Sequence, residues 1–526
     1  MDKQILENLI LEASSQKTLT ERVFGKLKRK HMHNLKIHGL PSNMNLLPVY
    51  HELVKSGKIK PNGFLEQIIK KRKIRTLSGI ASITVLTKDW GCPGKCTFCP
   101  TEKGMPKSYL SNEPAVMRAI LSDFDPYGQV ESRLDSLRKQ GHSVNKIEVI
   151  VIGGTWSAIP YKYQEWYLKR VYDALNEKES KTLVYAMKKN EKAKHKLVGL
   201  TLETRPDWIT EEELKRMRKF GCTRVELGVQ SIYDDVLEAS QRGHKIDATI
   251  KATKLLKDSG FKINYHMMPN LPKSTPEKDT QMLKEIFKDQ NFKPDLLKIY
   301  PCMVVANAKL YDDFKAGKFR PYTDEELITI VKEAKEYIPE YCRVVRVIRD
   351  IPATSIVGGS HTSNLREIIQ QRMKKDGKEC RCIRCREIMN DEFDMANVKM
   401  IRRDYDASDG KEIFLSFEDT KNDKIISLLR LRIPSQKKNK IFPALSDTSI
   451  IREVHTYGHV VPVSQKDKKG LQHKGLGKKL LLEAERITKK EFKINKISVI
   501  AAVGVKDYYK KFGFKTRDTY MIKNLK

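Results

Sequence analysis

Six short apolar stretches rich in β-branched residues alternate with charged amphipathic stretches in the central part of the chain. They cover residues 80–87, 147–152, 197–202, 224–229, 262–266 and 296–300. Strand patterns separated by helical patterns are typical of repeated βα units and a parallel sheet. Such a sheet can close, or partly close, into a barrel whose chemistry lies on the loops after the strands. The sequence therefore predicts an α/β barrel-type domain over residues 76–300.

Polar or glycine-bearing segments follow each of these predicted strands. They are the cysteine loop 92–99, then Gly153, Gly154 and Thr155, then Glu203 and Arg205, then Gln230 and Ser231, then His266, and finally Tyr300 to Cys302. The carboxyl ends of parallel strands meet at one edge of a sheet, so we expect these residues to gather around one cavity. The polar loop 242–244 is a further candidate to face it.

The loop after the first predicted strand holds Cys92, Cys96 and Cys99 at C-x3-C-x2-C spacing. Close thiolates select zinc or an iron–sulfur cluster. Zinc would need a fourth ligand from elsewhere, whereas a [4Fe-4S] cluster on three cysteines would keep one iron open. With Phe98 before the last cysteine, the loop resembles the signature of radical S-adenosylmethionine (SAM) enzymes. That resemblance implies a [4Fe-4S] cluster whose open iron binds the amino and carboxylate groups of SAM.

The loops after the next strands supply candidate SAM contacts. Gly153, Gly154 and Thr155 offer backbone that the amino-acid part of SAM can approach closely. Glu203 and Arg205 either grip the ribose and carboxylate of SAM or form a structural ion pair. Gln230 and Ser231 are candidate adenosine contacts.

Residues 301–395 are expected to form a connector with a second cysteine triad, Cys380, Cys382 and Cys385. Three close thiols beside many arginines predict a structural Zn2+ site that needs one more ligand. We expect Cys302 to be that ligand, because it follows the last barrel strand, with Cys342 as the competitor. Free thiols are the alternative.

Residues 396–526 change to a β-hairpin pattern, over 412–417, 425–433 and 451–463. The segment Gln472–Gly477 then precedes an amphipathic helix at 478–490, a strand at 496–502, and Tyr508 and Tyr509. Glycines at a helix start let backbone N–H groups face a pyrophosphate. The order Q-x-x-G-x-G, helix, strand, Tyr-Tyr-x-x-x-Gly-Phe resembles the acyl-CoA-binding core of GNAT acetyltransferases.

The chain carries a formal net charge of +34, which favours a polyanionic partner such as nucleic acid. Residues 1–75 contain 16 Lys and Arg against 6 Asp and Glu, with dense runs at 26–33 and 70–75. Apolar residues at helical spacing between these runs predict a basic helical region that contacts phosphates, rather than a disordered arm. A solvated lysine-rich surface is the alternative reading of the charge.

Nothing in the sequence predicts a membrane protein, because no apolar run approaches 18 residues and the first residues are polar. The nine cysteines fall at metal-ligand spacing rather than in a disulfide pattern, which favours the reducing cytoplasm.

Many segments together resemble the family of the catalytic subunit of Elongator, the tRNA uridine acetyltransferases. They are RTLSGIASITVLTK, CPGKCTFCP, IGGT, LETRPDW, ELGVQS, QRGHK, YHMMPNLP, RVIRDIP, LLRLRIP, REVHTYGHVVPV and QHKGLG. The compact spacing of the first two cluster cysteines is similar to the single-subunit, non-eukaryotic branch. The likeness runs from about residue 75 to the C-terminus.

This resemblance implies a reaction. A radical from SAM, formed with an external electron donor, takes hydrogen from the methyl group of acetyl-CoA. The resulting radical on the methyl carbon adds to C5 of the wobble uridine, position 34 of tRNA. Thioester hydrolysis then leaves a carboxymethyl group. The implied catalytic residues are Lys146, Glu453, His455 and Tyr509. The implied acetyl-CoA contacts are Lys146, Glu453, Val454, His455, Thr456, Gln472, Gly475, Leu476, Gly477, Lys478, Tyr508 and Tyr509.

Two other functions compete with this one. A protein-lysine (histone-type) acetyltransferase would use Glu453 or His455 as general base and keep the cluster as a structural element. A non-catalytic tRNA-binding scaffold would tolerate loss of Cys96. The sequence leaves open whether the chain forms a homodimer.

Overall fold

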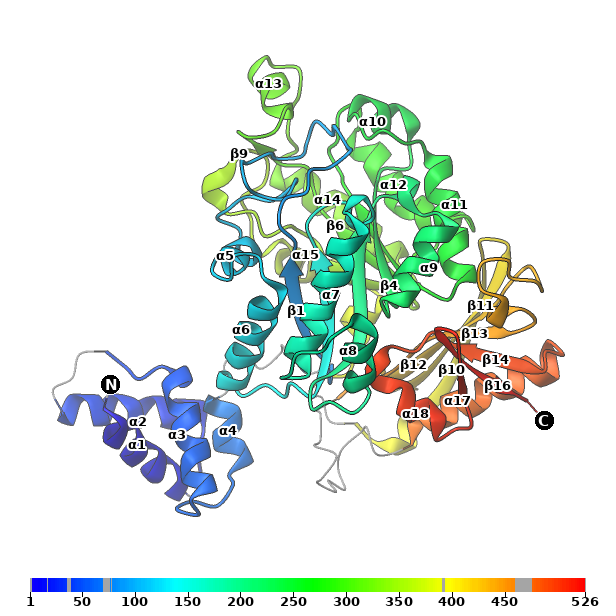
Figure 1. Ribbon diagram of the computed structural model, residues 1–526. Coiled ribbons are helices and arrows are strands. Elements are labelled where there is room, and N and C mark those ends of the chain that lie inside the picture. The colour runs from blue at the N-terminus through cyan, green and yellow to red at the C-terminus, as the bar shows by residue number, and fades with distance from the viewer. Residues whose placement is uncertain are drawn as a thin grey trace.

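A computed structural model describes residues 2–16, 18–35, 39–69, 76, 78–389, 393–458 and 475–525. The chain has three parts in order: an N-terminal helical region, an α/β domain with a curled parallel sheet, and a C-terminal domain with a mixed sheet (Figure 1). No helix among the described residues is long and apolar enough to cross a bilayer.

The N-terminal region is helical, as its periodicity predicts. Its helices are α1 (Lys3–Ser15), α2 (Glu21–Asn34), α3 (Asn43–Lys55) and α4 (Gly63–Ile69). They bury their own apolar core, which includes Leu9, Leu46 and Leu65. The helices lie at the lower left of Figure 1, beside α6 (Pro126–Lys139) of the barrel. The basic run 26–33 is on α2, whereas the run 70–75 lies outside the described residues.

The central sheet consists of parallel strands in the order β1-β2-β3-β4-β5-β6-β8. The strands are β1 (Ala81–Leu86), β2 (Lys146–Ile152), β3 (Lys196–Thr204), β4 (Arg224–Gln230), β5 (Lys262–Met267), β6 (Leu296–Ile299) and β8 (Arg343–Arg346). All six strands predicted from the sequence are confirmed. Parallel strands are covered on both faces, which explains their near-continuous apolar character. β1 and β8 form the two edges, so the sheet is a partial barrel.

Helices cover the outer face of this sheet. They are α5 (Pro114–Ile120), α6 (Pro126–Lys139), α7 (Tyr161–Leu175), α8 (Leu183–Asn190), α9 (Glu211–Lys219), α10 (Asp234–Ala239), α11 (Ile246–Asp258), α12 (Pro276–Lys288) and α14 (Asp324–Tyr337). Helix α13 (Leu310–Lys315) lies beyond the strand ends, at the top of Figure 1. Local signals set their starts. Thr275 caps α12, whose first residue is Pro276, and Thr323 with Glu326 forms a capping box on α14.

The expected connector contributes to the barrel, which the sequence reading did not foresee. Strand β8 pairs with β6 and adds a seventh strand to the sheet. It was missed because it has only four residues and begins and ends with arginine, Arg343 and Arg346. The rest of this region holds β7 (Val304–Val305) paired with β9 (Ile356–Gly358), and helices α15 (Leu365–Lys375) and α16 (Ile383–Arg386).

The C-terminal sheet has the order β10-β11-β12-β13-β14-β16-β15. Its strands are β10 (Val398–Ala407), β11 (Gly410–Asp419), β12 (Lys424–Ile433), β13 (Ser449–Thr456), β14 (Lys496–Val499), β15 (Lys515–Arg517) and β16 (Tyr520–Asn524). Only the β13–β14 pair is parallel. Helix α17 (Leu476–Arg486) packs on this sheet, and α18 (Lys506–Lys510) follows β14. The predicted hairpin strands, helix and following strand are therefore present, except that the end of the third predicted strand, 459–463, lies outside the described residues.

The C-terminal sheet is packed directly against the barrel, at the ends where the barrel strands begin (Figure 1). A Cβ added to Gly504 would lie 2.8 Å from the carbonyl oxygen of Leu197 on β3, so only glycine allows this approach. Lys262, at the start of β5, forms an ion pair with Glu453 on β13 at 2.9 Å.

A buried charge network lies in the same interface. The carboxylate of Asp295, just before β6, is fully buried and accepts hydrogen bonds from Arg452 and from the Ile263 N–H group. Arg430 lies 3.6 Å from the same carboxylate. Burial alone would raise the pKa of Asp295, but Arg452, Lys257 and Arg430 hold it below its usual range. The two units are thus joined by buried charges as well as by apolar contacts.

Candidate active site

The carboxyl ends of the barrel strands surround a cavity of about 610 Å³. Of the sequence-predicted residues, its wall includes Cys92, Cys96, Cys99, Gly154, Thr155, Glu203, Arg205 and Gln230. The expected gathering of strand-end residues is therefore observed. Gly153 and Ser231 are not on this wall: the Gly153 backbone packs against Thr87, and buried Ser231 accepts a hydrogen bond from the Tyr233 N–H group.

The first cysteine triad lies on the loop that follows the carboxyl end of β1. Cys96 is buried, and the Cys92 sulfur lies 3.4 Å from the Thr155 hydroxyl oxygen. A hydrogen bond with Cys99 lowers the pKa of Cys96 to about 5, with help from Arg242 and Arg205. The chain thus stabilises a thiolate here, which is the form that binds metal.

The three sulfurs of this triad border the same cavity. A Cβ on Gly94 would lie 3.5 Å from the Cys92 sulfur and 3.6 Å from the Cys96 sulfur. Both sulfurs therefore border the same glycine, and Cys92, Cys96 and Cys99 all line the cavity. Three cysteines that face one cavity suit an iron–sulfur cluster held by Cys92, Cys96 and Cys99.

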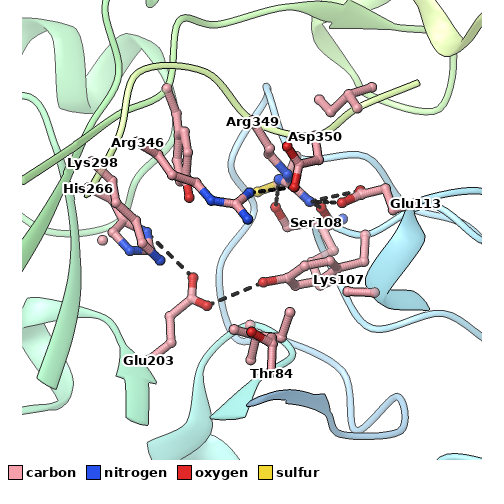
Figure 2. Close-up of a pocket in the computed structure, with 18 of the residues that line it drawn as sticks. Thr84, Lys107, Ser108, Glu113, Glu203, His266, Lys298, Arg346, Arg349 and Asp350 are labelled. Atoms are coloured by element: carbon pink, nitrogen blue, oxygen red, sulfur yellow. Dashed lines mark hydrogen bonds and ion pairs between the residues drawn. The ribbon is translucent and has the colours of Figure 1, made fainter. Parts of the chain in front are cut away.

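A buried acid–base network forms one wall of the cavity (Figure 2). Glu203 accepts a hydrogen bond from the Tyr109 hydroxyl at 3.2 Å and lies 3.6 Å from His266. His266 in turn contacts buried Glu226 at 2.8 Å, and Lys298 forms an ion pair with Glu226. Burial alone would raise the pKa of Glu226, but Lys298 and His266 hold it well below its usual range. The Glu203 carboxylate faces the cavity with its orientation fixed.

The alternative in which Glu203 and Arg205 pair with each other does not hold. Arg205 donates to both carboxylate oxygens of Asp207, at 2.9 and 2.8 Å. Each residue therefore presents its own group to the cavity, Glu203 from the end of β3 and Arg205 from the position directly after β3.

Cationic side chains line the side of the cavity opposite Glu203. Figure 2 shows Arg346 with Asp350, and Arg349 with Glu113, in ion pairs of 2.7 and 2.9 Å. Further cationic residues line other parts of the wall: Lys107, Arg118, Arg133, Arg242, and Lys298 beside His266. Lys298 and Arg349 are single charged residues without a spacing motif of their own; Arg349 lies in RVIRDIP, one of the segments that resemble the family. Cationic groups in a cleft attract anionic ligands.

The second cysteine triad is compact. The ligand atoms of Cys380, Cys382 and Cys385 all lie within 4.8 Å of one another, and they form the only such group found in the described part of the chain. The Cys382 and Cys385 sulfurs are 3.7 Å apart. Two thiolates on a tetrahedral zinc with Zn–S bonds of about 2.3 Å stand roughly 3.8 Å apart. This spacing fits zinc.

The structure corrects the expected fourth ligand of this triad. Cys302 packs in a separate buried cluster with Cys96, Phe98 and Leu271, beside the first triad. The loop after β6 turns toward the barrel mouth, so Cys302 follows it there. The competitor Cys342 is adjacent to the second triad instead, since its carbonyl oxygen accepts a hydrogen bond from the Ile383 N–H group at 2.9 Å. Burial, together with the nearby Cys382, raises the pKa of the Cys342 thiol well above its usual range.

The predicted acyl-CoA residues gather between β13, α17 and α18. A Cβ on Gly477 would lie 3.0 Å from the Tyr508 hydroxyl, 3.8 Å from the Thr456 hydroxyl and 4.0 Å from Val454. Gly475 has a left-handed φ of 72° at the N-cap of α17, followed by Leu476, Gly477 and Lys478. Gln472 lies outside the described residues.

The four residues expected to be catalytic occupy different settings. Glu453 is held between Lys262 and Arg430, at 2.9 and 2.8 Å. Burial alone would raise the pKa of Glu453, but these cations hold it below its usual range. Burial lowers the pKa of His455, whose Nε2 lies 3.0 Å from the Ser78 carbonyl oxygen.

The other two are Lys146 and Tyr509. Burial lowers the pKa of Lys146, the first residue of β2, and raises that of Tyr509 on α18. The two burial effects favour the neutral form of each side chain.

Comparison with known proteins agrees with this geometry. Residues 91–286 match the radical SAM superfamily, and residues 294–375 match the radical SAM C-terminal domain. The chain is therefore a radical SAM protein.

Individual relatives narrow the assignment further. A tRNA uridine(34) acetyltransferase of Methanocaldococcus infernus is 44% identical over 535 residues, covering 99% of this chain and 98% of that protein. Elongator complex protein 3 of Homo sapiens is 41% identical over 476 residues, covering 87% of this chain and 86% of that protein. A solved structure of the archaeal Methanocaldococcus infernus Elp3 with an N-terminal deletion has a TM-score of 0.75 and 44% identity, and covers 85% of this chain and 99% of that one. The chain belongs to the family of tRNA uridine(34) acetyltransferases and Elongator complex protein 3.

Proposed function

We propose that this chain is a tRNA uridine(34) acetyltransferase that places a carboxymethyl group on C5 of the wobble uridine. The observation that carries the proposal is the cavity in which a three-cysteine loop, a fixed carboxylate and a cationic wall face one another. Membership of the family supports action on uridine 34 of tRNA with an acetyl donor, because relatives that cover nearly the whole chain are named tRNA uridine(34) acetyltransferase.

In this proposal Cys92, Cys96 and Cys99 hold a [4Fe-4S] cluster, and SAM binds in the cavity. The cluster and SAM supply one-electron chemistry that amino-acid side chains lack, with an electron from an external donor. Gly154 leaves room for the amino-acid part of SAM, while Glu203 and Gln230 face its nucleoside. The Tyr109 hydroxyl and His266 fix the Glu203 carboxylate before the ligand arrives, which reduces the cost of ordering it on binding.

Acetyl-CoA is the proposed acyl donor, held by a GNAT-like unit. At Gly475 and Gly477, backbone N–H groups at the start of α17 can face the pyrophosphate. The backbone of β13 near Thr456 can pair with the pantetheine amides. Glu453 remains an anion tied to Lys262 of the barrel, so we assign it a positioning role between the two units. Lys146, Tyr509 and His455 stay candidates for contact with the acyl group.

The rival activity, acetylation of a protein lysine, finds less support here. Its general base would be Glu453 or His455. Glu453 is locked between two cations, and His455 has a lowered pKa and its Nε2 against a carbonyl oxygen. Either group would be a weak base in this setting.

The nine free cysteines suit the reducing cytoplasm, where we place the enzyme.

The proposal is tested with protein reconstituted anaerobically with iron and sulfide, then given SAM, acetyl-CoA, dithionite and a tRNA transcript. Mass analysis of the nucleosides should show carboxymethyluridine, and a transcript with cytidine at position 34 should give none. A histone peptide is offered in parallel. Acetylated peptide without modified tRNA would reverse the assignment in favour of the rival.

Removing residues 1–75 should weaken tRNA binding several-fold and flatten its salt dependence. Helix α2 carries the basic run 26–33, and each lost phosphate contact reduces the slope of log affinity against log salt by roughly 0.9 for duplex regions. Binding is measured at several salt concentrations for the full chain and the shortened one. Equal slopes would show that this region does not contact phosphate.

Zinc at the second triad gives a separate prediction. With Cys380, Cys382, Cys385 and, as fourth ligand, Cys342, the intact protein should contain about one tightly held zinc per chain. Cys382→Ser should lose this zinc and lower the unfolding temperature, while Cys222→Ser, at a buried cysteine outside both triads, should keep it. Metal analysis of both variants decides; an intact protein without zinc would refute the site.

A further inference from the structure

Two arginines are buried against the cysteine loop, and only one of them has a carboxylate partner. Arg205 is 5% exposed and is paired with Asp207. Arg242 is 6% exposed, and among the described residues it forms no ion pair with a carboxylate. A buried cation without a counter-charge is unfavourable by several kcal/mol, so such a group is normally placed beside an anion.

The nearest anionic candidate for Arg242 is the sulfur of Cys96. The Arg242 Nη1 group donates to this sulfur at 3.5 Å, and its Nη2 group donates to the carbonyl oxygen of Gly228. The second bond fixes the plane of the guanidinium. Its Nε group has no hydrogen-bond partner despite being buried.

Glycines make room for both arginines. A Cβ on Gly228 would lie 2.6 Å from Arg242 Nη2, and a Cβ on Gly94 would lie 2.6 Å from Arg205 Nη1. Any side chain at either position would push a guanidinium away from the cysteine loop. Arg205 Nη1 is also buried without a hydrogen-bond partner. Gly94 belongs to the cysteine loop itself, so this cation borders the Cys92 and Cys96 sulfurs.

We propose that Arg242, supported by Arg205, raises the reduction potential of the iron–sulfur cluster. Arg242 donates a hydrogen bond to the Cys96 sulfur and places its positive charge beside it. This role rests on the cluster of the proposed function, and in it Arg242 acts on the cluster through the Cys96 sulfur. Reduction adds one electron, taken from an external low-potential donor, and so increases the negative charge held by the thiolate-bound centre. A nearby guanidinium stabilises the reduced form more than the oxidised form. Hydrogen bonds to cluster sulfurs and local charge are known levers on such potentials.

The alternative for these arginines is direct contact with the carboxylate of SAM. The geometry favours the sulfur for Arg242, because both of its terminal nitrogens already donate to the protein. The two roles differ in what they change: one alters the potential without SAM, and the other alters the affinity for SAM alone.

The experiment is a redox titration of the full chain, reconstituted with iron and sulfide and followed by electron paramagnetic resonance in the absence of SAM. Arg242→Gln removes the charge and Arg242→Lys retains it. At the wild-type midpoint, we expect the reduced-to-oxidised ratio of Arg242→Gln to fall about tenfold, equivalent to about 59 mV for a one-electron couple. The reduced-to-oxidised ratio of Arg242→Lys should fall less than that of Arg242→Gln. Arg346→Gln is the matched control, a cavity cation paired with Asp350 rather than with the cysteine loop, and should keep the wild-type ratio.

Iron content is measured for each variant before titration. Arg242→Gln with full iron and the wild-type ratio would overturn the inference, as would an equal shift in Arg346→Gln. If Arg242→Gln fails to retain iron, Arg242→Lys decides: a lowered ratio supports the inference and an unchanged one overturns it. A wild-type protein that binds no cluster would instead refute the proposed function.

Discussion

Cys96→Ala should reduce SAM cleavage by the reconstituted protein about a hundredfold or more. Cys96 is the most deeply enclosed cysteine of the first triad, at 4% exposed, and its sulfur lies against Arg242. Alanine removes one of three thiolates that hold the cluster. The neighbouring Cys302, on the loop after β6, is a poor replacement because burial raises the pKa of its thiol to about 12. We therefore expect loss of the bound iron together with loss of activity.

The measurement is release of 5′-deoxyadenosine from SAM in the presence of tRNA, with iron content determined on the same samples. Cys222→Ala is the control. Cys222 is also buried, but it lies just before the start of β4, its thiol donates to the Arg224 carbonyl oxygen, and it does not line the cavity. Normal SAM cleavage by Cys96→Ala would rule out the radical route and leave the scaffold or the peptide acetyltransferase.

Asp295→Ala should lower the free energy of unfolding by about 3–5 kcal/mol. The Asp295 carboxylate is fully buried and is the shared partner of Arg452, Arg430 and Lys257. Alanine would leave these cations in the interface with fewer counter-charges. Because the folded-state pKa of Asp295 is below its ordinary value, its stabilising effect is present above the ordinary aspartate range. It is lost as the pH falls toward the folded-state pKa.

Denaturant unfolding of the full chain, followed by circular dichroism, tests this value. Asp235→Ala is the matched control, since Asp235 pairs with Lys278 at 2.7 Å on the surface and should cost only about 0.2–1 kcal/mol. The barrel and the C-terminal sheet should lose their joint transition in Asp295→Ala. Equal losses in both variants would mean that the interface network adds nothing to stability.

The barrel strands could be predicted because each is a self-contained apolar run, as buried parallel strands are. β8 could not, because its short sequence begins and ends with arginine. Arg343 finds its partner in Glu387, 44 residues further along the chain, at 2.7 Å. A sequence pattern shows local burial, whereas a strand stabilised by distant charges has no local signature.

The same distinction applies to the site. The two cysteine triads were found because their spacing is local. The cavity wall was found only in part, because Tyr109, Lys298 and Arg349 are single polar residues whose role depends on where the chain returns in space. The choice of Cys302 as a zinc ligand failed for a related reason: a position after β6 does not tell which way the loop turns.

The partial closure of the barrel has a consequence for how its two edges are held together. β1 and β8 are the free edges of the sheet, and the cavity wall takes residues from both, Thr84 on β1 and Arg346 on β8. The segments that follow these strands bridge the gap, since Arg349, after β8, donates to the Ser108 hydroxyl and pairs with Glu113, both after β1. On this side the width of the cavity is therefore set by side-chain contacts instead of by the hydrogen bonds of a sheet.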